Sequence, residues 1–152
     1  MPQSLSAVYI HIVFSTKNRL PLIIPELRPQ LWMYLGGICR GLHCMPVQIG
    51  GTSDHVHILS LLARDIAIQA LIAKVKAESS KWMKMQKQPV PDFQWQTGYG
   101  IFSVSPKDRQ GVIEYIANQE EHHRTRTFQE EFLLFLKKYD VPYDENHLWD
   151  EP

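Results

Sequence analysis

Four short segments rich in β-branched and aromatic residues occur in a fixed order with two longer amphipathic segments, and this order leaves few topologies open to the chain. The strand-like segments are residues 7–14, 45–51, 54–62 and 99–105. The helix-like segments are residues 25–43 and 66–85. The resulting order of strand, helix, strand, strand, helix and strand is that of the split βαβ plan. It predicts an α+β, ferredoxin-like (RRM-like) βαββαβ domain, in which a four-stranded antiparallel sheet carries helices on one face.

Two further helices are expected after the fourth strand, appended at the C-terminal end of the domain. Residues 105–123 begin with Ser105, a candidate N-cap, and with Pro106, which suits the first helical position because it lacks a backbone N–H. Residues 128–139, FQEEFLLFLKKY, combine apolar and charged side chains at helical spacing.

The charge of the chain is unevenly distributed. All 16 lysine and arginine residues lie at or before Lys138, and the eleven acidic residues among them leave residues 1–139 with a formal charge of +5. This suits a polyanionic ligand, although it is weaker than the basic surface of an obligate duplex binder. The length of 152 residues is that of one domain. We therefore expect one folded domain over residues 1–140 and an acidic tail over residues 141–152.

The apolar segments and the cysteines indicate a cytoplasmic protein without a membrane anchor. No apolar run approaches the roughly 20 residues of a spanning helix, and the first residues lack the basic and apolar pattern of a secretory signal. Cys39 and Cys44 are the only cysteines and have no CxxC spacing, so we expect buried free thiols and no zinc knuckle.

The most specific local pattern is DHVHIL, in which His55 and His57 are separated by one residue on an expected strand. The period of two places both imidazoles on the same face, where they could bind one metal ion together. Val56 and Ile58 would face the core on the other side. A pair of solvated histidines would show the same spacing, so the pattern alone leaves both interpretations open.

A second pattern, VIEYIANQ, places Tyr115 and Gln119 one helical turn apart on a shared face. The tyrosine hydroxyl could form a covalent intermediate, and the glutamine carbonyl oxygen could be a third metal ligand. His123 follows after four more residues on the same face, where it could be another ligand or a phosphate contact. The alternatives are a core tyrosine and a surface histidine near the helix end.

Five segments taken in order resemble a known family. They are HIVFSTKNR, GGTSDHVHIL, KVKAESSKW, WQTGYGIFSVS and YIANQ. Together they resemble the HUH-superfamily single-tyrosine transposases of bacterial insertion sequences, including the family named after insertion sequence 200 and its REP-associated relatives. The resemblance extends over residues 5–123. It implies that residues 1–140 form a ferredoxin-like catalytic domain that cleaves and rejoins single-stranded DNA at hairpin-flanked ends.

The resemblance also assigns roles to individual residues. His55 and His57 correspond to the histidine pair, Gln119 to the helix-borne ligand, and Tyr115 to the nucleophile that forms a 5′-phosphotyrosine. It implies a Mg²⁺ or Mn²⁺ ion, a bacterial cytoplasmic location, and a homodimer. In such a dimer the tyrosine helix could complete the metal site of its own subunit or that of the partner, and the sequence leaves both arrangements open. His123 lies outside the simplest family pattern, which leaves the ligand role of Gln119 open.

Contacts to DNA are expected from basic side chains in two regions. They are Lys17 and Arg19 after the first strand, and Lys74, Lys76 and Lys81 on the second helix. Trp95 and Tyr99 could stack on unpaired bases, with a core position for Trp95 as the alternative. His11 is expected to be structural or to support the site from behind.

Two other functions are compatible with the same residues. The chain could bind hairpin or single-stranded nucleic acid without cutting it, in which case the histidine pair would be incidental. It could also be a metal-dependent nuclease that attacks with water, which would leave Tyr115 structural.

Overall fold

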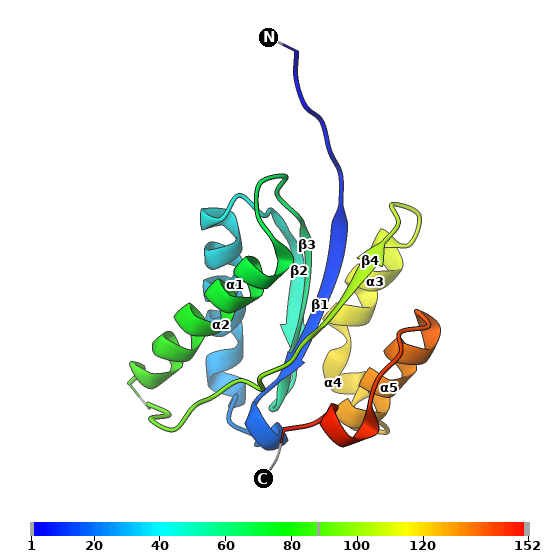
Figure 1. The fold of residues 1–152 in the computed structure, drawn as a ribbon. Coiled ribbons are helices and arrows are strands. Elements are labelled where there is room, and N and C mark those ends of the chain that lie inside the picture. The colour runs from blue at the N-terminus through cyan, green and yellow to red at the C-terminus, as the bar shows by residue number, and fades with distance from the viewer. Residues whose placement is uncertain (1, 88, 151–152) are drawn as a thin grey trace.

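The computed structural model describes residues 2–87 and 89–150, and its centre is a four-stranded sheet (Figure 1). The strands are β1 (Tyr9–Ser15), β2 (Pro46–Gly51), β3 (His55–Leu61) and β4 (Gly100–Val104). They lie in the order β2-β3-β1-β4, and each neighbouring pair is antiparallel. This is the ferredoxin-like arrangement, so the predicted fold class is confirmed.

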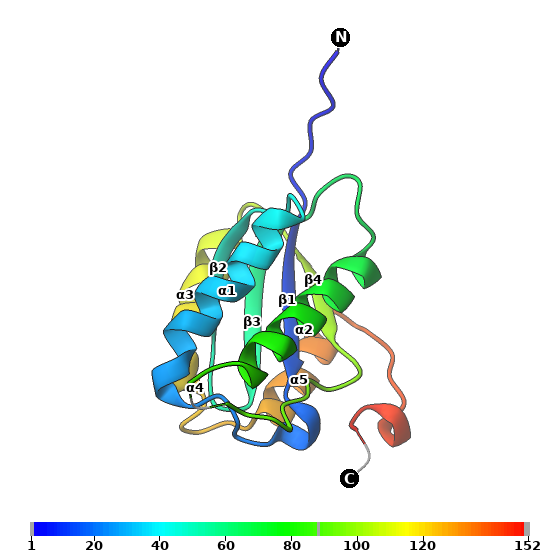
Figure 2. The ribbon, with the colours of Figure 1, turned by 90° about the vertical axis from the view of Figure 1, so that its left-hand side faces the viewer.

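Helices cover both faces of the sheet, as Figures 1 and 2 show. The two crossover helices, α1 (Arg28–Gly41) and α2 (Ile68–Lys84), lie on one face, as the sequence order predicts. The appended helices lie on the opposite face; they are α3 (Arg109–Ala117), α4 (Gln119–His122) and α5 (Phe128–Lys138). Three short 3₁₀ turns complete the described elements, namely η1 (Lys17–Arg19), η2 (Pro25–Leu27) and η3 (Glu145–His147).

The alternation of side chains along the strands divides the interior into two parts. Ile10, Ile12 and Phe14 of β1 point toward α1 and α2 and join the larger core. Val13, on the opposite face of β1, packs with α5 residues in a smaller core. Because the second face is also covered, polar side chains on that face become buried.

The predicted helix over residues 105–123 is divided in the structure. Residues 105–108 form a turn, and Ser105 bonds the side chain of Asp108 at 3.0 Å instead of capping the helix. A second interruption falls at Asn118, whose φ and ψ are −106° and 26°. There the carbonyl of Tyr115 accepts a hydrogen bond from the Gln119 side chain at 3.3 Å. The Asn118 side chain likewise bonds the Glu114 carbonyl at 2.9 Å. An asparagine side chain that bonds nearby backbone competes with the helical pattern, which favours a break at this residue.

The C-terminal segment is anchored to the domain. Thr127 and Glu130 form a capping box that starts α5. The tail then returns so that the Trp149 ring packs against the rings of Phe128 and Phe132. Asp150 accepts hydrogen bonds from the backbone and hydroxyl groups of Thr97. Residues 151–152 of the expected acidic tail lie outside the described residues, and the boundary at residue 140 stays a prediction.

Among the helices described, none has the length and hydropathy to cross a membrane.

Candidate active site

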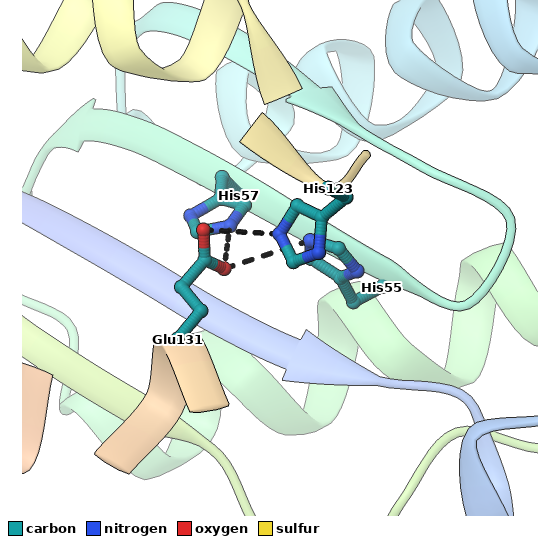
Figure 3. A group of neighbouring side chains, drawn as sticks. All are labelled: His55, His57, His123 and Glu131. Atoms are coloured by element: carbon teal, nitrogen blue, oxygen red, sulfur yellow. Dashed lines mark hydrogen bonds and ion pairs between the residues drawn. The ribbon is translucent and has the colours of Figure 1, made fainter. Parts of the chain in front are cut away.

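Strand β3 carries the histidine pair into the smaller core. His55 and His57 point from one face of the strand toward α4 and α5, and both are fully buried (Figure 3). Val56 and Ile58 point to the opposite face and join the larger core. The geometry expected from the period of two is therefore present, whereas the alternative of a solvated pair is wrong.

Two side chains from the C-terminal helices complete the cluster. One donor atom each from His55, His57, His123 and Glu131 lies within 4.8 Å of all the others. Glu131 Oε1 is 2.8 Å from His57 Nε2 and 3.6 Å from His55 Nε2. Glu131 Oε2 is 3.1 Å from His123 Nε2. The carboxylate thus lies among three imidazoles, as Figure 3 shows.

The far sides of the two strand histidines are also hydrogen-bonded, which fixes the orientation of their rings. His55 Nδ1 is 2.7 Å from Asp54 Oδ1 and 3.0 Å from Thr52 Oγ1. His57 Nδ1 is 2.8 Å from His11 Nε2. His11 is buried and has the supporting position that the sequence suggests.

Tyr115 and Gln119 reach the cluster from α3 and α4 of the same chain. The Tyr115 hydroxyl donates a hydrogen bond to Glu131 Oε2. Gln119 Oε1 is 2.9 Å from His55 Nε2, and the Gln119 side chain is buried. The structure therefore brings together all the residues that the sequence proposes for nucleophile and ligands.

Gly50 allows helix α3, which carries Tyr115, to lie close to the sheet. Helix α3 packs directly on β2, where a Cβ atom on Gly50 would lie 2.6 Å from the backbone oxygen of Ile116. Only the absence of a side chain at residue 50 permits this contact. Because Ile116 follows Tyr115, the contact sets the depth at which the tyrosine enters the cluster.

Burial and charge determine the protonation of the cluster. Burial lowers the pKa of His57 to about 4, against the opposing effect of Glu131. Burial alone would raise the pKa of Glu131, but hydrogen bonds to His123 and His57 outweigh it and hold that pKa well below its usual range. Burial, and then the charge of Glu131, raise the pKa of Tyr115 well above its ordinary value. At neutral pH the cluster therefore holds a carboxylate, a neutral His57 and a neutral tyrosine.

The donor set fits a divalent metal ion. Nitrogen or oxygen ligands about 2.1 Å from one ion lie at most about 4.2 Å from each other, and the separations of Glu131 from the three imidazoles are 2.8 to 3.6 Å. Imidazole nitrogen and carboxylate oxygen are the usual ligands of such ions. These residues could hold a metal ion after small side-chain shifts.

Comparison with known proteins identifies the family. The family described as "Transposase IS200 like" matches residues 4–119, which is most of the chain. The chain belongs to this transposase family. No curated protein matches it. His123 and Glu131, two of the four clustered donors, lie beyond the residues that the family match covers.

Two solved structures share the fold of this transposase. A candidate transposase from Deinococcus radiodurans R1 is 22% identical, with a TM-score of 0.59 over 78% of this chain and 98% of that one. A REP-associated tyrosine transposase bound to a REP hairpin is 13% identical, with a TM-score of 0.60 over 95% of this chain and 90% of that one.

Of the five basic residues proposed for DNA contact, those on α2 lie away from the cluster. Three are on α2, on the opposite face of the sheet (Figure 1). Of these, Lys74 pairs with Glu78 at 3.2 Å, Lys81 is exposed, and the Lys76 amine bonds the carbonyl groups of Gln96, Thr97 and Gly98. Burial lowers the pKa of Lys76 to about 8.

The other candidate contacts differ in position. Lys17 lines an open hollow of about 660 Å³ that it shares with Lys76. Arg19, also in η1, lies over the Trp149 ring. Trp95 is only 8% exposed and bonds Ser79, so its core alternative holds, whereas Tyr99 is 37% exposed.

A second hollow, of about 720 Å³, opens beside the cluster of the transposase. His123 forms part of its wall, together with Asp54, the partner of His55. Three arginines also line it, namely Arg28, Arg124 and Arg126. Three acidic residues, Asp54, Glu120 and Glu130, line the same hollow, and Arg28 pairs with Glu120 at 2.8 Å. The hollow therefore places both basic and acidic side chains next to the candidate active site.

Glu131 is the residue that the sequence interpretation missed. A local signal exists, because Glu131 follows Phe128 by three residues and precedes Phe135 by four, so it lies on the apolar face of its helix. A charged side chain on such a face needs a partner in the interior. The sequence does not say which partner.

Proposed function

We propose that this transposase cleaves and rejoins single-stranded DNA at hairpin-flanked ends, with Tyr115 as the nucleophile. One observation carries the proposal: the Tyr115 hydroxyl bonds a carboxylate that is surrounded by the three histidines of the same chain. Family membership supports the reaction class. A structural relative bound to a REP hairpin supports the class of substrate.

The proposed reaction is an exchange of phosphodiester bonds. The Tyr115 oxygen attacks the phosphorus atom, so that an O–P bond to the tyrosine forms and the bond from phosphorus to the 3′-oxygen breaks. The tyrosine gives up its proton, and the departing 3′-oxygen takes one up. Attack of a 3′-hydroxyl on the 5′-phosphotyrosine reverses the exchange. The bond energy is retained throughout, so no nucleotide cofactor is required.

We propose that His55 and His57 hold a divalent ion, with Gln119 and His123 as candidates for further ligands. When bound, the ion supplies positive charge that stabilises the negative charge growing on the phosphate oxygens. The nitrogen donors favour Mn²⁺ over Mg²⁺, because Mg²⁺ prefers oxygen ligands. Gln119 Oε1 faces His55 Nε2, the nitrogen that also faces Glu131, so Gln119 lies on the cluster side of that ring, where it either coordinates the ion or orients the ring.

The single strand would approach through the hollow beside His123. Arg126 lines this hollow and could contact a phosphate. Arg28 and Arg124 would first exchange their ion pairs with Glu120 and Glu121 for such a contact.

The earlier candidates Lys74, Lys76 and Lys81 would then contact only more distant parts of a bound hairpin. Lys17 and Arg19 follow the end of β1 that pairs with His55 and would contact parts closer to the cluster. The homodimer and the bacterial cytoplasmic location remain parts of the proposal that rest on the family resemblance.

The test is formation of a covalent protein–DNA adduct. The protein is incubated with a labelled single-stranded hairpin library and Mn²⁺, and a denaturing gel separates the adduct. We expect a band that chelator abolishes and that Tyr115→Phe lacks while still binding the DNA. Tyr143→Phe, at an exposed tyrosine, should retain the band. An adduct formed by Tyr115→Phe would exclude Tyr115 as the nucleophile.

A nuclease that attacks with water is the second candidate, because burial and Glu131 keep the Tyr115 hydroxyl protonated. Cleavage that persists in Tyr115→Phe but disappears in His57→Ala would favour this function. Retention of hairpins without any cleavage would instead favour a binding protein.

A further inference from the structure

Glu131 connects two parts of the cluster that the family pattern treats separately. Its Oε1 atom faces the strand histidines, at 2.8 Å from His57 and 3.6 Å from His55. Its Oε2 atom accepts the hydrogen bond from Tyr115 and lies 3.1 Å from His123. The two oxygens of one carboxylate therefore serve the candidate metal ligands and the candidate nucleophile.

Helix α5 holds this carboxylate in a fixed position. Phe128, Phe132 and Leu136 of α5 are buried against Val13 and other residues of the sheet. The capping box at the start of α5 adds a defined beginning to the helix. As a result the Glu131 side chain is only 1% exposed and enters the cluster from the side opposite β3.

A charge in such a place requires compensation. A buried, ionised carboxylate is costly unless it is paired or coordinates a metal ion. His57, His123 and Tyr115 are bonded to this carboxylate. A divalent cation among His55, His57 and Glu131 would add positive charge beside it, and two imidazoles with one carboxylate form a common ligand set for such ions.

We propose that Glu131 is a ligand of the divalent ion through Oε1 and holds the Tyr115 hydroxyl through Oε2, so that one side chain sets the distance between ion and nucleophile. This deepens the proposed function and rests on it for the role of Tyr115. The ligand role stands on the geometry of the cluster alone. Helix α5 is thereby a part of the active site.

The first experiment measures Mn²⁺ binding by the full chain with calorimetry, before any DNA is added. Glu131→Gln keeps the size and the acceptor oxygen but removes the charge, so we expect Mn²⁺ affinity to fall at least tenfold. Glu130→Gln is the matched control, because it removes the same charge from an exposed neighbour while glutamine still suits the capping box. Affinity of Glu131→Gln within twofold of the unmodified protein would overturn the ligand role.

The second experiment separates the two roles of the side chain. At saturating Mn²⁺, Glu131→Gln should recover most of the rate of adduct formation, because its amide oxygen still accepts from Tyr115. Glu131→Leu should not recover it. Equal recovery by both variants would overturn the role in holding Tyr115. If Glu131→Gln loses Mn²⁺ while the unmodified protein never forms an adduct, the ligand role stands and the strand-transfer function fails.

A measurement on the unmodified protein avoids dependence on the folding of variants. If Glu131 coordinates the ion, Mn²⁺ should slow hydrogen exchange of the backbone amides of α5 relative to those of α2, which lies on the other face of the sheet. Exchange in α5 that is the same with Mn²⁺ and with chelator would overturn the proposal.

Discussion

At the scale of single residues, the candidate site depends on a buried histidine that stays neutral. The folded chain holds the pKa of His57 at about 4, whereas the ordinary value is 6.5. Between these values the unfolded chain binds a proton that the folded chain excludes. Stability contributed in this way is present above pH 6.5 and is lost as the pH falls toward 4.

We therefore expect the metal-free protein to lose stability on mild acidification. Between pH 7 and pH 5, His57 alone accounts for a loss of about 2 kcal/mol in the free energy of unfolding. Urea denaturation in the presence of chelator at both pH values measures this loss. His57→Gln should reduce the difference in the free energy of unfolding between pH 7 and pH 5. His147→Gln, at an exposed histidine, should leave that difference unchanged. Equal stability at both pH values would contradict the buried neutral state.

Much of the site could be predicted residue by residue. The strand period placed His55 and His57 on one face, and the spacing of four placed Tyr115 with Gln119. Both arrangements follow from local geometry, so the sequence contains them directly. Glu131 could not be found in this way, because its role depends on where α5 docks across the sheet. His123 was only a candidate for the same reason, since its position depends on the break at Asn118.

At the scale of elements, the contact between α3 and β2 positions the nucleophile. Gly50 lies so close to Ile116 that any side chain there would collide with the backbone of α3. An obstacle at residue 50 would push the helix outward, and Tyr115 would move with it. The tyrosine is therefore positioned from behind by a strand that contributes no ligand.

We expect Gly50→Ala to affect both stability and activity. Overpacking at a close contact costs about 1 to 3 kcal/mol, and the outward shift of α3 should slow adduct formation by more than tenfold. Thermal unfolding and single-turnover assays measure the two effects.

Gly37→Ala is the matched control for this substitution. Residue 37 lies within α1 with open space around it. Alanine there should stabilise the helix by up to about 1 kcal/mol and leave the adduct rate unchanged. A rate for Gly50→Ala equal to that of the control would show that α3 does not position the nucleophile.

Helices and strands with a regular spacing of apolar residues were predicted well. The helical segment that side-chain hydrogen bonds interrupt was not. The strands and the crossover helices α1 and α2 agree with their apolar patterns to within a few residues. The segment from Ser105 to His123 was predicted as one helix, because its periodicity continues across Asn118. The bond from the Gln119 side chain to the Tyr115 carbonyl becomes evident only in three dimensions.

At the scale of the whole molecule, one chain supplies every group of the candidate site. Tyr115 bonds Glu131 and lies beside His57 of the same chain, with ring centroids 5.8 Å apart. The family resemblance left open whether the tyrosine comes from the same subunit or from a partner subunit. In the described chain these groups meet within one subunit, and we therefore predict that each subunit assembles its own site.

A mixing experiment tests this arrangement. Tyr115→Phe and His57→Ala proteins, each inactive alone, are unfolded and refolded together so that any dimer can form from both. If each chain assembles its own site, the mixture should form no adduct above the background of the separate variants. Adduct restored to about a quarter or more of the unmodified level would show that the tyrosine acts on the partner's histidines.

The enclosure of the site was not predictable from the sequence. An apolar face on α5 shows that this helix packs against something, but not that it covers the second face of the sheet. The sequence order predicted helices on one face, and the appended helices were left unplaced. Their position turns a surface histidine pair into a buried cluster.

That enclosure has a kinetic consequence. His55 and His57 are inaccessible to solvent and Gln119 and Glu131 are 1% exposed, whereas Tyr115 is only partly buried. The ligand atoms of the cluster are therefore closed to a phosphate in this conformation. Side chains of α4 or α5 must first move aside. The rate of such local opening is set by the protein and does not depend on the DNA sequence. At saturating oligonucleotide, good and poor target sequences would then be nicked at the same maximal rate. The two would differ only in the DNA concentration needed to reach that rate.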